Sequence, residues 1–332
     1  MYSILLSEWL VAAGLLILTV ELVQEWVEVF EFLKFDSFKV FNDHALGKIF
    51  FPKGLNYYEN LSTYVSIKHG RSCAIKVSDF EWILVKGGGW NYGGCLVYRS
   101  TKDKELIFGL FGKTDAIREY EVSKKIEEIA NEFPQVLYYK IFSDYKLPSQ
   151  YDFLKTIKYN DLKPVEPCLL YTKVKSPFRI ADLQFYSDSI KNEIIRISCE
   201  YWNIGINDYL EYFCKKLANH VSLMHKNGFI NDSLEYSNIT MLAEIVDYEW
   251  ITAPNIPLPD GNSGNVFTYE RKEKEILYAV EAILFLSALI HIKYDFFDIY
   301  ETFISEYKKT NSDYVDLNIN IWKILKRERF IF

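Results

Sequence analysis

Three residue groups along this chain have the types and order of a nucleotide-binding site, and the first is a lysine followed by glycines. Lys86 ends an apolar run, and Gly87, Gly88 and Gly89 follow it at once. Glycines let backbone N–H groups approach an anion closely, and a neighbouring lysine adds a compact positive charge. The pattern predicts a phosphate-binding turn after a strand. The alternative is a glycine-rich hairpin whose lysine is simply exposed to solvent.

The second group is a glutamate on the apolar face of an expected helix. Glu119 lies three and seven residues before Val122 and Ile126, which belong to the buried stripe of a helix expected over about 115–133. An unpaired carboxylate on a buried face is costly, so Glu119 needs a cation. Lys86 is the natural candidate, because a Lys–Glu pair between strand and helix aims the lysine of kinase-like folds at ATP phosphates. The alternative is a glutamate in a frayed first turn, stabilised by the helix dipole.

The third group brackets a short apolar segment. Asn238 and Asp247 stand nine residues apart with a largely apolar interior between them. A tight hairpin would bring the amide oxygen and the carboxylate together at one rim. Hard divalent cations take a few such oxygen ligands and keep waters for the remaining positions. The spacing therefore predicts that Asn238 and Asp247 bind Mg²⁺, or Mn²⁺ in its place. The alternative is an ordinary hairpin with polar residues at its ends.

A general base is harder to assign. Kinases place an aspartate five residues before the metal-binding asparagine, but Ser233 occupies that position here and Asp232 stands one residue earlier. We predict Asp232 as a catalytic residue together with Asp247, provided that the loop carries a bulge. The alternative is an Asx-type loop residue. On the same hairpin Glu244 is expected to face solvent, while Glu249 is a candidate for binding the metal or supporting its ligands.

The elements that must position these residues are a sheet followed by helices. Short apolar runs at 74–77, 82–85, 95–98 and 106–111 are separated by glycines and charged residues, which is typical of an antiparallel sheet. Two more strands are expected over 137–142 and 169–174. After about residue 182 the pattern becomes helical, with a core-facing stripe from Leu210 to Met224, and helices resume over about 270–309.

This order predicts an α+β protein with a two-lobed protein-kinase-like fold, in which a β-rich N-lobe with one key helix precedes a mostly helical C-lobe. We expect an N-terminal helical segment over 1–55, the N-lobe over 56–182, and the C-lobe with its metal-binding hairpin over 183–332.

Composition limits the kind of environment and partner. A formal charge of −7 argues against a general nucleic-acid binder, which needs a basic face. Five scattered cysteines cannot all pair and form no CxxC, which favours a reducing, cytoplasmic environment. The apolar run at 9–20 is shorter than the roughly 20 residues that a membrane span needs. Glu281 interrupts the longer run at 276–292, so we expect no membrane span.

Several segments resemble the selenoprotein O family: Lys86-Gly-Gly-Gly, Arg118-Glu119-Tyr120, Ser176-Pro-Phe-Arg179 after a strand, and Asn238 to Tyr248. The resemblance covers about residues 80–250 discontinuously. That family has a protein-kinase-like fold and transfers AMP from ATP to protein hydroxyl groups. The resemblance implies that Lys86 and Arg179 bind phosphates, that Glu119 orients Lys86, and that Asn238 and Asp247 hold Mg²⁺.

Two departures from the family pattern bear on the reaction. Ser237 stands where family members usually carry an aspartate, and Glu249 follows Asp247-Tyr248 where they carry glycine. The Asp-Tyr-Glu sequence looks more like small-molecule phosphotransferases of the same superfamily. The chain is also shorter and lacks the family's C-terminal redox cysteine or selenocysteine. We expect ATP- and Mg²⁺-dependent transfer of AMP to protein hydroxyls. Phosphoryl transfer to a protein or small molecule, and a nucleotide-binding pseudoenzyme, are the alternatives; no motif identifies the acceptor.

Overall fold

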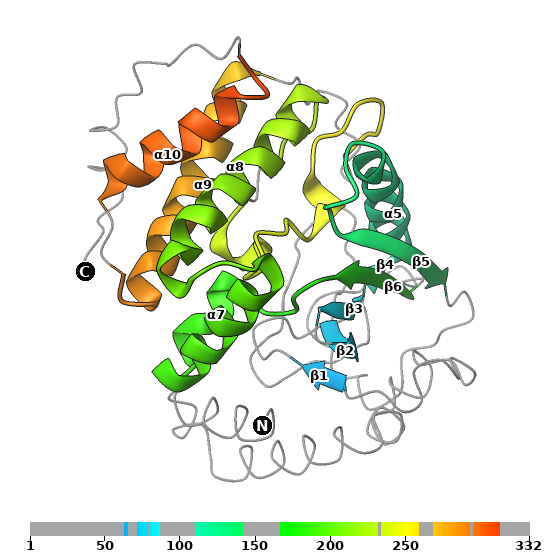
Figure 1. The fold of residues 1–332 in the computed structure, drawn as a ribbon. Helices are drawn as coiled ribbons and strands as arrows, with labels where there is room; N and C mark the ends of the chain where they lie inside the picture. Colours follow the sequence, from blue (N-terminus) through cyan, green and yellow to red (C-terminus); the bar gives the residue numbers. More distant parts are fainter. Residues whose placement is uncertain are drawn as a thin grey trace, which may run out of the picture.

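The structure is a computed structural model that describes residues 63–65, 72–78, 80–86, 111–141, 167–231, 234–258, 268–292 and 295–312. These residues form a mixed α and β fold built around an antiparallel sheet, with most helices grouped on one side of it (Figure 1). Several sequence predictions lie outside the described residues: the helical segment over 1–55, the strand at 95–98, the turn Gly87–Gly89, and Asp232.

The sheet contains six described strands: β1 (Thr63–Val65), β2 (Ser72–Ser78), β3 (Glu81–Lys86), β4 (Phe111–Gly112), β5 (Gln135–Ile141) and β6 (Pro167–Val174). They follow the order β1-β2-β3-β6-β4, β5 also pairs with β6, and all pairs are antiparallel. The predicted strands at 74–77, 82–85, 137–142 and 169–174 are thus confirmed within one or two residues. Lys86 pairs with Ser72 and Leu170, which places it inside the sheet rather than at its edge.

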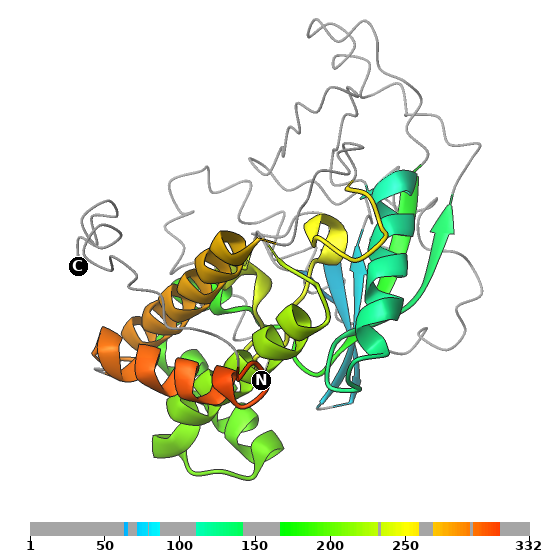
Figure 2. The ribbon, with the colours of Figure 1, turned by 90° about the horizontal axis from the view of Figure 1, so that it is seen from above.

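Helix α5 (Lys113–Glu127) packs along β5 and β6. Its residue Ala116 forms a small core with Phe111, Val136 and Leu170, all fully buried. The helix ends six residues before the predicted end at residue 133, because the chain turns there to enter β5 at Gln135. Figure 2 shows α5 beside the sheet, with the segment around residue 250 close to it.

The remaining elements are helical: η4 (Ile180–Phe185), α7 (Asp188–Trp202), η5 (Ile206–Asp208), α8 (Tyr209–Lys226), η6 (Tyr236–Asn238), η7 (Tyr248–Trp250), α9 (Tyr269–Leu289) and α10 (Phe296–Lys308). The stripe predicted from Leu210 to Met224 is confirmed as the buried face of α8. The helical region predicted over 270–309 is two helices, because the chain turns after Leu289 and Asp295 caps α10 through the Phe297 N–H at 2.7 Å.

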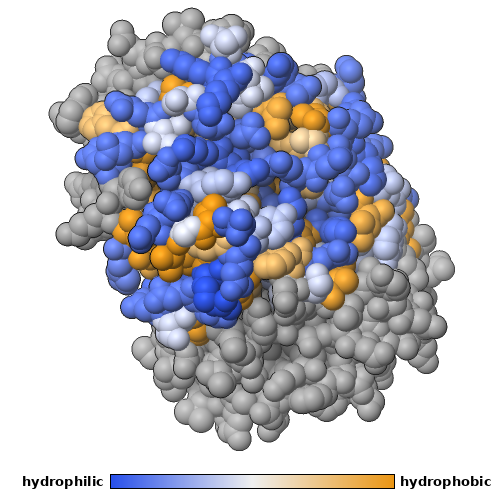
Figure 3. All heavy atoms as spheres, in the orientation of Figure 1, coloured by the Kyte–Doolittle hydropathy of each residue, from blue (hydrophilic) through white to orange (hydrophobic). Residues whose placement is uncertain are grey.

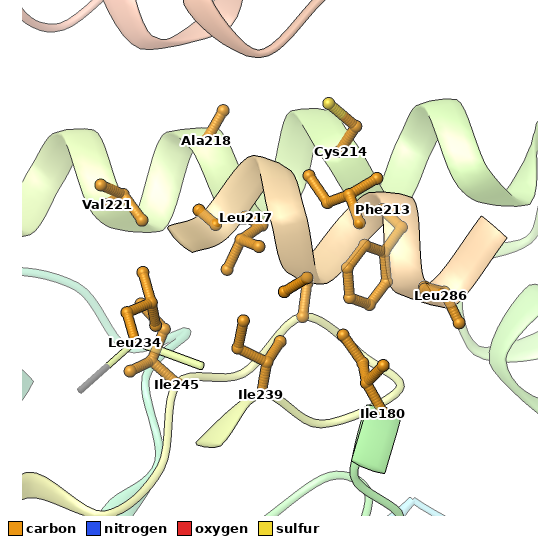
Figure 4. Close-up of a cluster of buried hydrophobic side chains, with 14 of the residues drawn as sticks. Ile180, Phe213, Cys214, Leu217, Ala218, Val221, Leu234, Ile239, Ile245 and Leu286 are labelled. Atoms are coloured by element: carbon orange, nitrogen blue, oxygen red, sulfur yellow. The ribbon is translucent and has the colours of Figure 1, made fainter. Parts of the chain in front are cut away.

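One large core joins these helices to α5. Its members include Val122 of α5, Leu217 of α8 and Leu286 of α9. Figure 4 shows how side chains of α8 and α9 meet Ile239 and Ile245, which lie between Asn238 and Asp247. The segment that carries the predicted metal ligands is therefore anchored in the helical core.

The surface on the face drawn in Figure 3 is largely hydrophilic where it is described, with scattered hydrophobic areas. Among the described helices, none combines the length and the apolarity that crossing a bilayer requires.

Candidate functional site

Lys86 of β3 and Glu119 of α5 form a buried ion pair. Lys86 Nζ lies 2.8 Å from Glu119 Oε2, and the side chains are 10% and 4% exposed. Glu119 occupies the second turn of α5, not a frayed first turn, and faces the sheet because α5 packs along β5 and β6. The predicted pairing of Lys86 with Glu119 is confirmed, and the alternative of an exposed lysine is wrong.

Two further carboxylates approach the same ammonium. Lys86 Nζ forms an ion pair with Asp247, and it lies 3.2 Å from Glu249 Oε2. Oxygens of Glu119, Asp247 and Glu249 all lie within 4.8 Å of one another. Burial raises the pKa of Glu119 to about 7, with Asp247 and Glu249 adding to the rise and Lys86 opposing it. Three carboxyl groups therefore gather around the Lys86 ammonium, and burial together with this crowding favours the protonated form of Glu119.

The backbone at Asp247 explains how one short segment delivers two carboxylates. Asp247 has φ 72° and ψ 70°, in the left-handed region that aspartate and asparagine tolerate better than most residues. The chain turns there from the hairpin into η7, which contains Glu249. The Tyr248 N–H donates to Glu119 Oε1 at 3.3 Å, so Glu119 binds both Lys86 and the chain beside Asp247.

The hairpin predicted between Asn238 and Asp247 is present in a short form. Ile239 and Ile245 form an antiparallel bridge, and the Val246 N–H donates to the Asn238 carbonyl at 2.9 Å. Asn238 itself ends the 3-10 turn η6 rather than beginning a strand. The main chains beside the two predicted metal ligands thus meet at the open end of the hairpin.

Arg179 lies against Asn238. It belongs to the connection between β6 and η4, and its Nη1 donates to the Ser237 carbonyl at 2.7 Å and to Asn238 Oδ1 at 3.4 Å. A bridge between Arg179 and Thr240 fixes the connection along the hairpin. The structure therefore groups Arg179 with Asn238, and Lys86 with Glu119, Asp247 and Glu249.

The prediction that Glu244 faces solvent is wrong. Glu244 is 1% exposed, and its carboxylate accepts hydrogen bonds from Lys175 N at 2.9 Å, Ser176 N at 3.2 Å and Thr240 Oγ1 at 3.2 Å. Burial raises its pKa to about 7, although these donors oppose the rise. Residues 240–244 form a tight turn in which Ala243 has φ 58°, and this turn places the Glu244 carboxylate against the main chain of Lys175 and Ser176.

The donor set fits a hard divalent cation. Carboxylate oxygens from Glu119, Asp247 and Glu249 are the ligand type that Mg²⁺ and Mn²⁺ prefer, whereas the amide oxygen of Asn238 accepts from Arg179. Sequence reasoning ranked Glu249 below Asn238, whereas the structure places it against Lys86. Sequence reasoning quoted Arg118 only within the segment that resembles the family and gave it no role of its own. The acceptors of Arg118 include main-chain carbonyls, which leave no signal in side-chain types.

No protein-family model matches this chain, and no curated protein matches it. The chemistry of the site and the resemblance of its sequence segments are therefore the basis for the proposed function.

Proposed function

We propose that this chain is an ATP- and Mg²⁺-dependent transferase with a two-lobed protein-kinase-like fold. The observation that supports it most strongly is the convergence of three separate elements on the Lys86 ammonium: β3 supplies the lysine, α5 supplies Glu119, and the hairpin supplies Asp247. A strand lysine held by a helix glutamate beside a metal-binding aspartate is the arrangement that positions triphosphate in kinase-like enzymes.

The arrangement of elements supports the same proposal. A sheet carrying α5 stands on one side, helices α7 to α10 stand on the other, and the hairpin lies between them (Figure 1). We assign the N-lobe to 56–182 and the C-lobe to 183–332.

The cation would be held by Asn238 and Asp247, with Glu249 as an additional carboxylate. A Mg²⁺ ion held there would supply positive charge that offsets the charge of the phosphates. Lys86 would contact the phosphates while Glu119 orients it, and Arg179 would add positive charge beside Asn238. These residues act mainly by positioning and by electrostatic stabilisation.

The proposed reaction is transfer of AMP to a protein hydroxyl group, by resemblance to the selenoprotein O family. The acceptor oxygen forms a bond to the α-phosphorus. The bond between that phosphorus and the oxygen shared by the α- and β-phosphates breaks, and pyrophosphate leaves. The hydroxyl proton would pass to Asp232. Asp232 stands one residue away from the position of the kinase aspartate. Loose transition states at phosphorus need little help from a base, so this displacement does not rule out the reaction.

Phosphoryl transfer is the second candidate, and the position of Glu249 favours it. The Glu249 carboxylate lies 3.2 Å from Lys86 Nζ, so it is a second acid beside Asp247 at the lysine. The Asp-Tyr-Glu sequence that supplies both acids looks like that of small-molecule phosphotransferases. In that reaction the acceptor oxygen bonds to the γ-phosphorus, and ADP leaves with the bridging oxygen.

Labelled ATP tests both reactions. The protein is incubated with Mg²⁺ and ATP labelled at the α or the γ phosphate, with itself, a protein extract and simple hydroxyl compounds as acceptors. Transfer of α label with release of pyrophosphate supports AMP transfer, and transfer of γ label supports phosphoryl transfer. Binding of Mg-ATP without either transfer supports a pseudoenzyme. A folded protein that neither binds nor consumes ATP contradicts all three.

A further inference from the structure

Arg118 binds the chain that follows Asp247. It precedes Glu119 on α5 and is 4% exposed. Its Nε donates to the Pro257 carbonyl at 2.6 Å, and its Nη1 donates to the Tyr248 carbonyl at 3.3 Å. Nη1 also donates to the carbonyl of Glu249, and Nη2 donates to that of Ile251. All four acceptors belong to residues 248–257, called here the 248–257 segment.

These contacts suit arginine rather than lysine. The 248–257 segment forms only the short η7 turn and two isolated bridges, so several of its carbonyls lack a partner in a regular helix or sheet. Buried carbonyls without a donor are costly. A guanidinium offers five N–H groups in a planar fork and can serve several carbonyls at once, whereas an ammonium is a single point of attachment.

Arg118 and Glu119 act on the same peptide neighbourhood. Glu119 Oε1 accepts from the Tyr248 N–H at 3.3 Å, while Arg118 donates to the Tyr248 carbonyl. Two consecutive residues of α5 therefore bind both sides of Tyr248, the residue between the carboxylates of Asp247 and Glu249. The position of those carboxylates relative to Lys86 is thereby tied to α5.

We propose that Arg118 is a positioning residue that fastens the 248–257 segment to α5 and so holds Asp247 and Glu249 at Lys86. No contact between Arg118 and nucleotide is required. The structural part of this inference stands independently, and its consequence for turnover rests on the proposed function.

The test compares Arg118→Lys and Arg118→Gln with Lys125→Ala. Lys125 lies two turns further along α5 and donates to the Pro254 carbonyl at 2.7 Å from an exposed position, so its variant removes a contact with the same segment without touching the buried fork. The measurements are amide hydrogen exchange across residues 248–257, and kcat, KM for ATP and the Mg²⁺ concentration for half-maximal turnover. Arg118→Lys keeps the positive charge, so it can be measured in place of Arg118→Gln if the glutamine variant folds poorly.

We expect both Arg118 variants to speed amide exchange in the 248–257 segment by about tenfold or more, since 1.4 kcal/mol of lost restraint corresponds to that factor. We expect kcat to fall and the Mg²⁺ requirement to rise by a similar factor, while KM for ATP changes much less and Lys125→Ala resembles the wild type. If Arg118 had a purely structural role, its variants would yield less folded protein, but the folded fraction would keep the wild-type kcat, Mg²⁺ requirement and KM for ATP.

The outcomes separate the two proposals. If the folded wild type binds no Mg-ATP, the proposed function is wrong, and amide exchange alone decides the role of Arg118. Unchanged exchange in both Arg118 variants overturns the inference in either case. Faster exchange with wild-type kcat and Mg²⁺ dependence would show that the segment is fastened but that the fastening does not position the carboxylates.

Discussion

Lys86 Nζ and Glu119 Oε2 lie 2.8 Å apart inside the protein, although 33 positions separate the two residues. Removing two charges from water is costly, and a buried ion pair is often no more stable than a well-packed apolar pair. The carboxylates of Asp247 and Glu249 also contact the Lys86 ammonium. Such a concentration of buried charge is typical of functional sites rather than of cores.

Replacing Lys86 by methionine tests the role of the ammonium. We expect Lys86→Met to lose Mg-ATP binding and to lower the free energy of unfolding by about 3 kcal/mol, because buried carboxylates lose their cation. Calorimetric titration and urea unfolding measure the two effects. Lys173→Met is the matched control, because Lys173 pairs with Glu81 on the same sheet while 40% exposed. Equal loss of ATP binding in both variants would contradict a specific role for Lys86.

Replacing Asp247 by asparagine tests the metal site. Asparagine tolerates the left-handed backbone at this position, so we expect the variant to fold. The loss of a charged oxygen ligand should weaken Mg²⁺-dependent ATP binding by at least about tenfold. Asp188→Asn, on the exposed start of α7, is the control. Unchanged Mg-ATP affinity and turnover in the Asp247 variant would remove this residue from the site.

Replacing Arg179 by glutamine tests whether this residue binds the phosphates or the adenosine of the nucleotide. Because Arg179 lies against Asn238, we expect Arg179→Gln to weaken ATP binding by about tenfold and adenosine binding far less, since only ATP carries the phosphate charge. Competition binding with the two ligands measures the difference. Arg196→Gln, on the exposed side of α7, should behave as the wild type. Equal weakening of both ligands would indicate a general loss of structure.

The features that depend on periodicity and on the cost of burying charge were predictable from the sequence. The α8 stripe was one, and the pairing of Lys86 with Glu119 was another, because a carboxylate on an apolar face demands a cation. The partners of Arg118 and Glu244 were not predictable. Both side chains bind main-chain groups 68 to 139 positions away, and main-chain groups are the same for almost every residue type.

The buried carboxyl of Glu244 predicts a pH dependence of stability. Its pKa is raised from 4.5 to about 7, chiefly by burial, so the folded protein binds an extra proton between those values. Stability therefore falls as pH rises through this range, by up to about 3 kcal/mol relative to a Glu244→Gln variant, in which residue 244 does not titrate. Urea unfolding of both proteins at pH 5 and pH 8 measures it. A difference between the proteins that is independent of pH would contradict this account.

The most direct measurement is calorimetric titration of ATP into the wild-type protein, with Mg²⁺ present and again with the metal chelated. The proposed site predicts one ATP bound per chain in Mg²⁺, and at least about tenfold weaker binding after chelation, because the carboxylates near Lys86 then repel the triphosphate. Absence of ATP binding by the folded protein at millimolar nucleotide, with or without Mg²⁺, would contradict the proposed function.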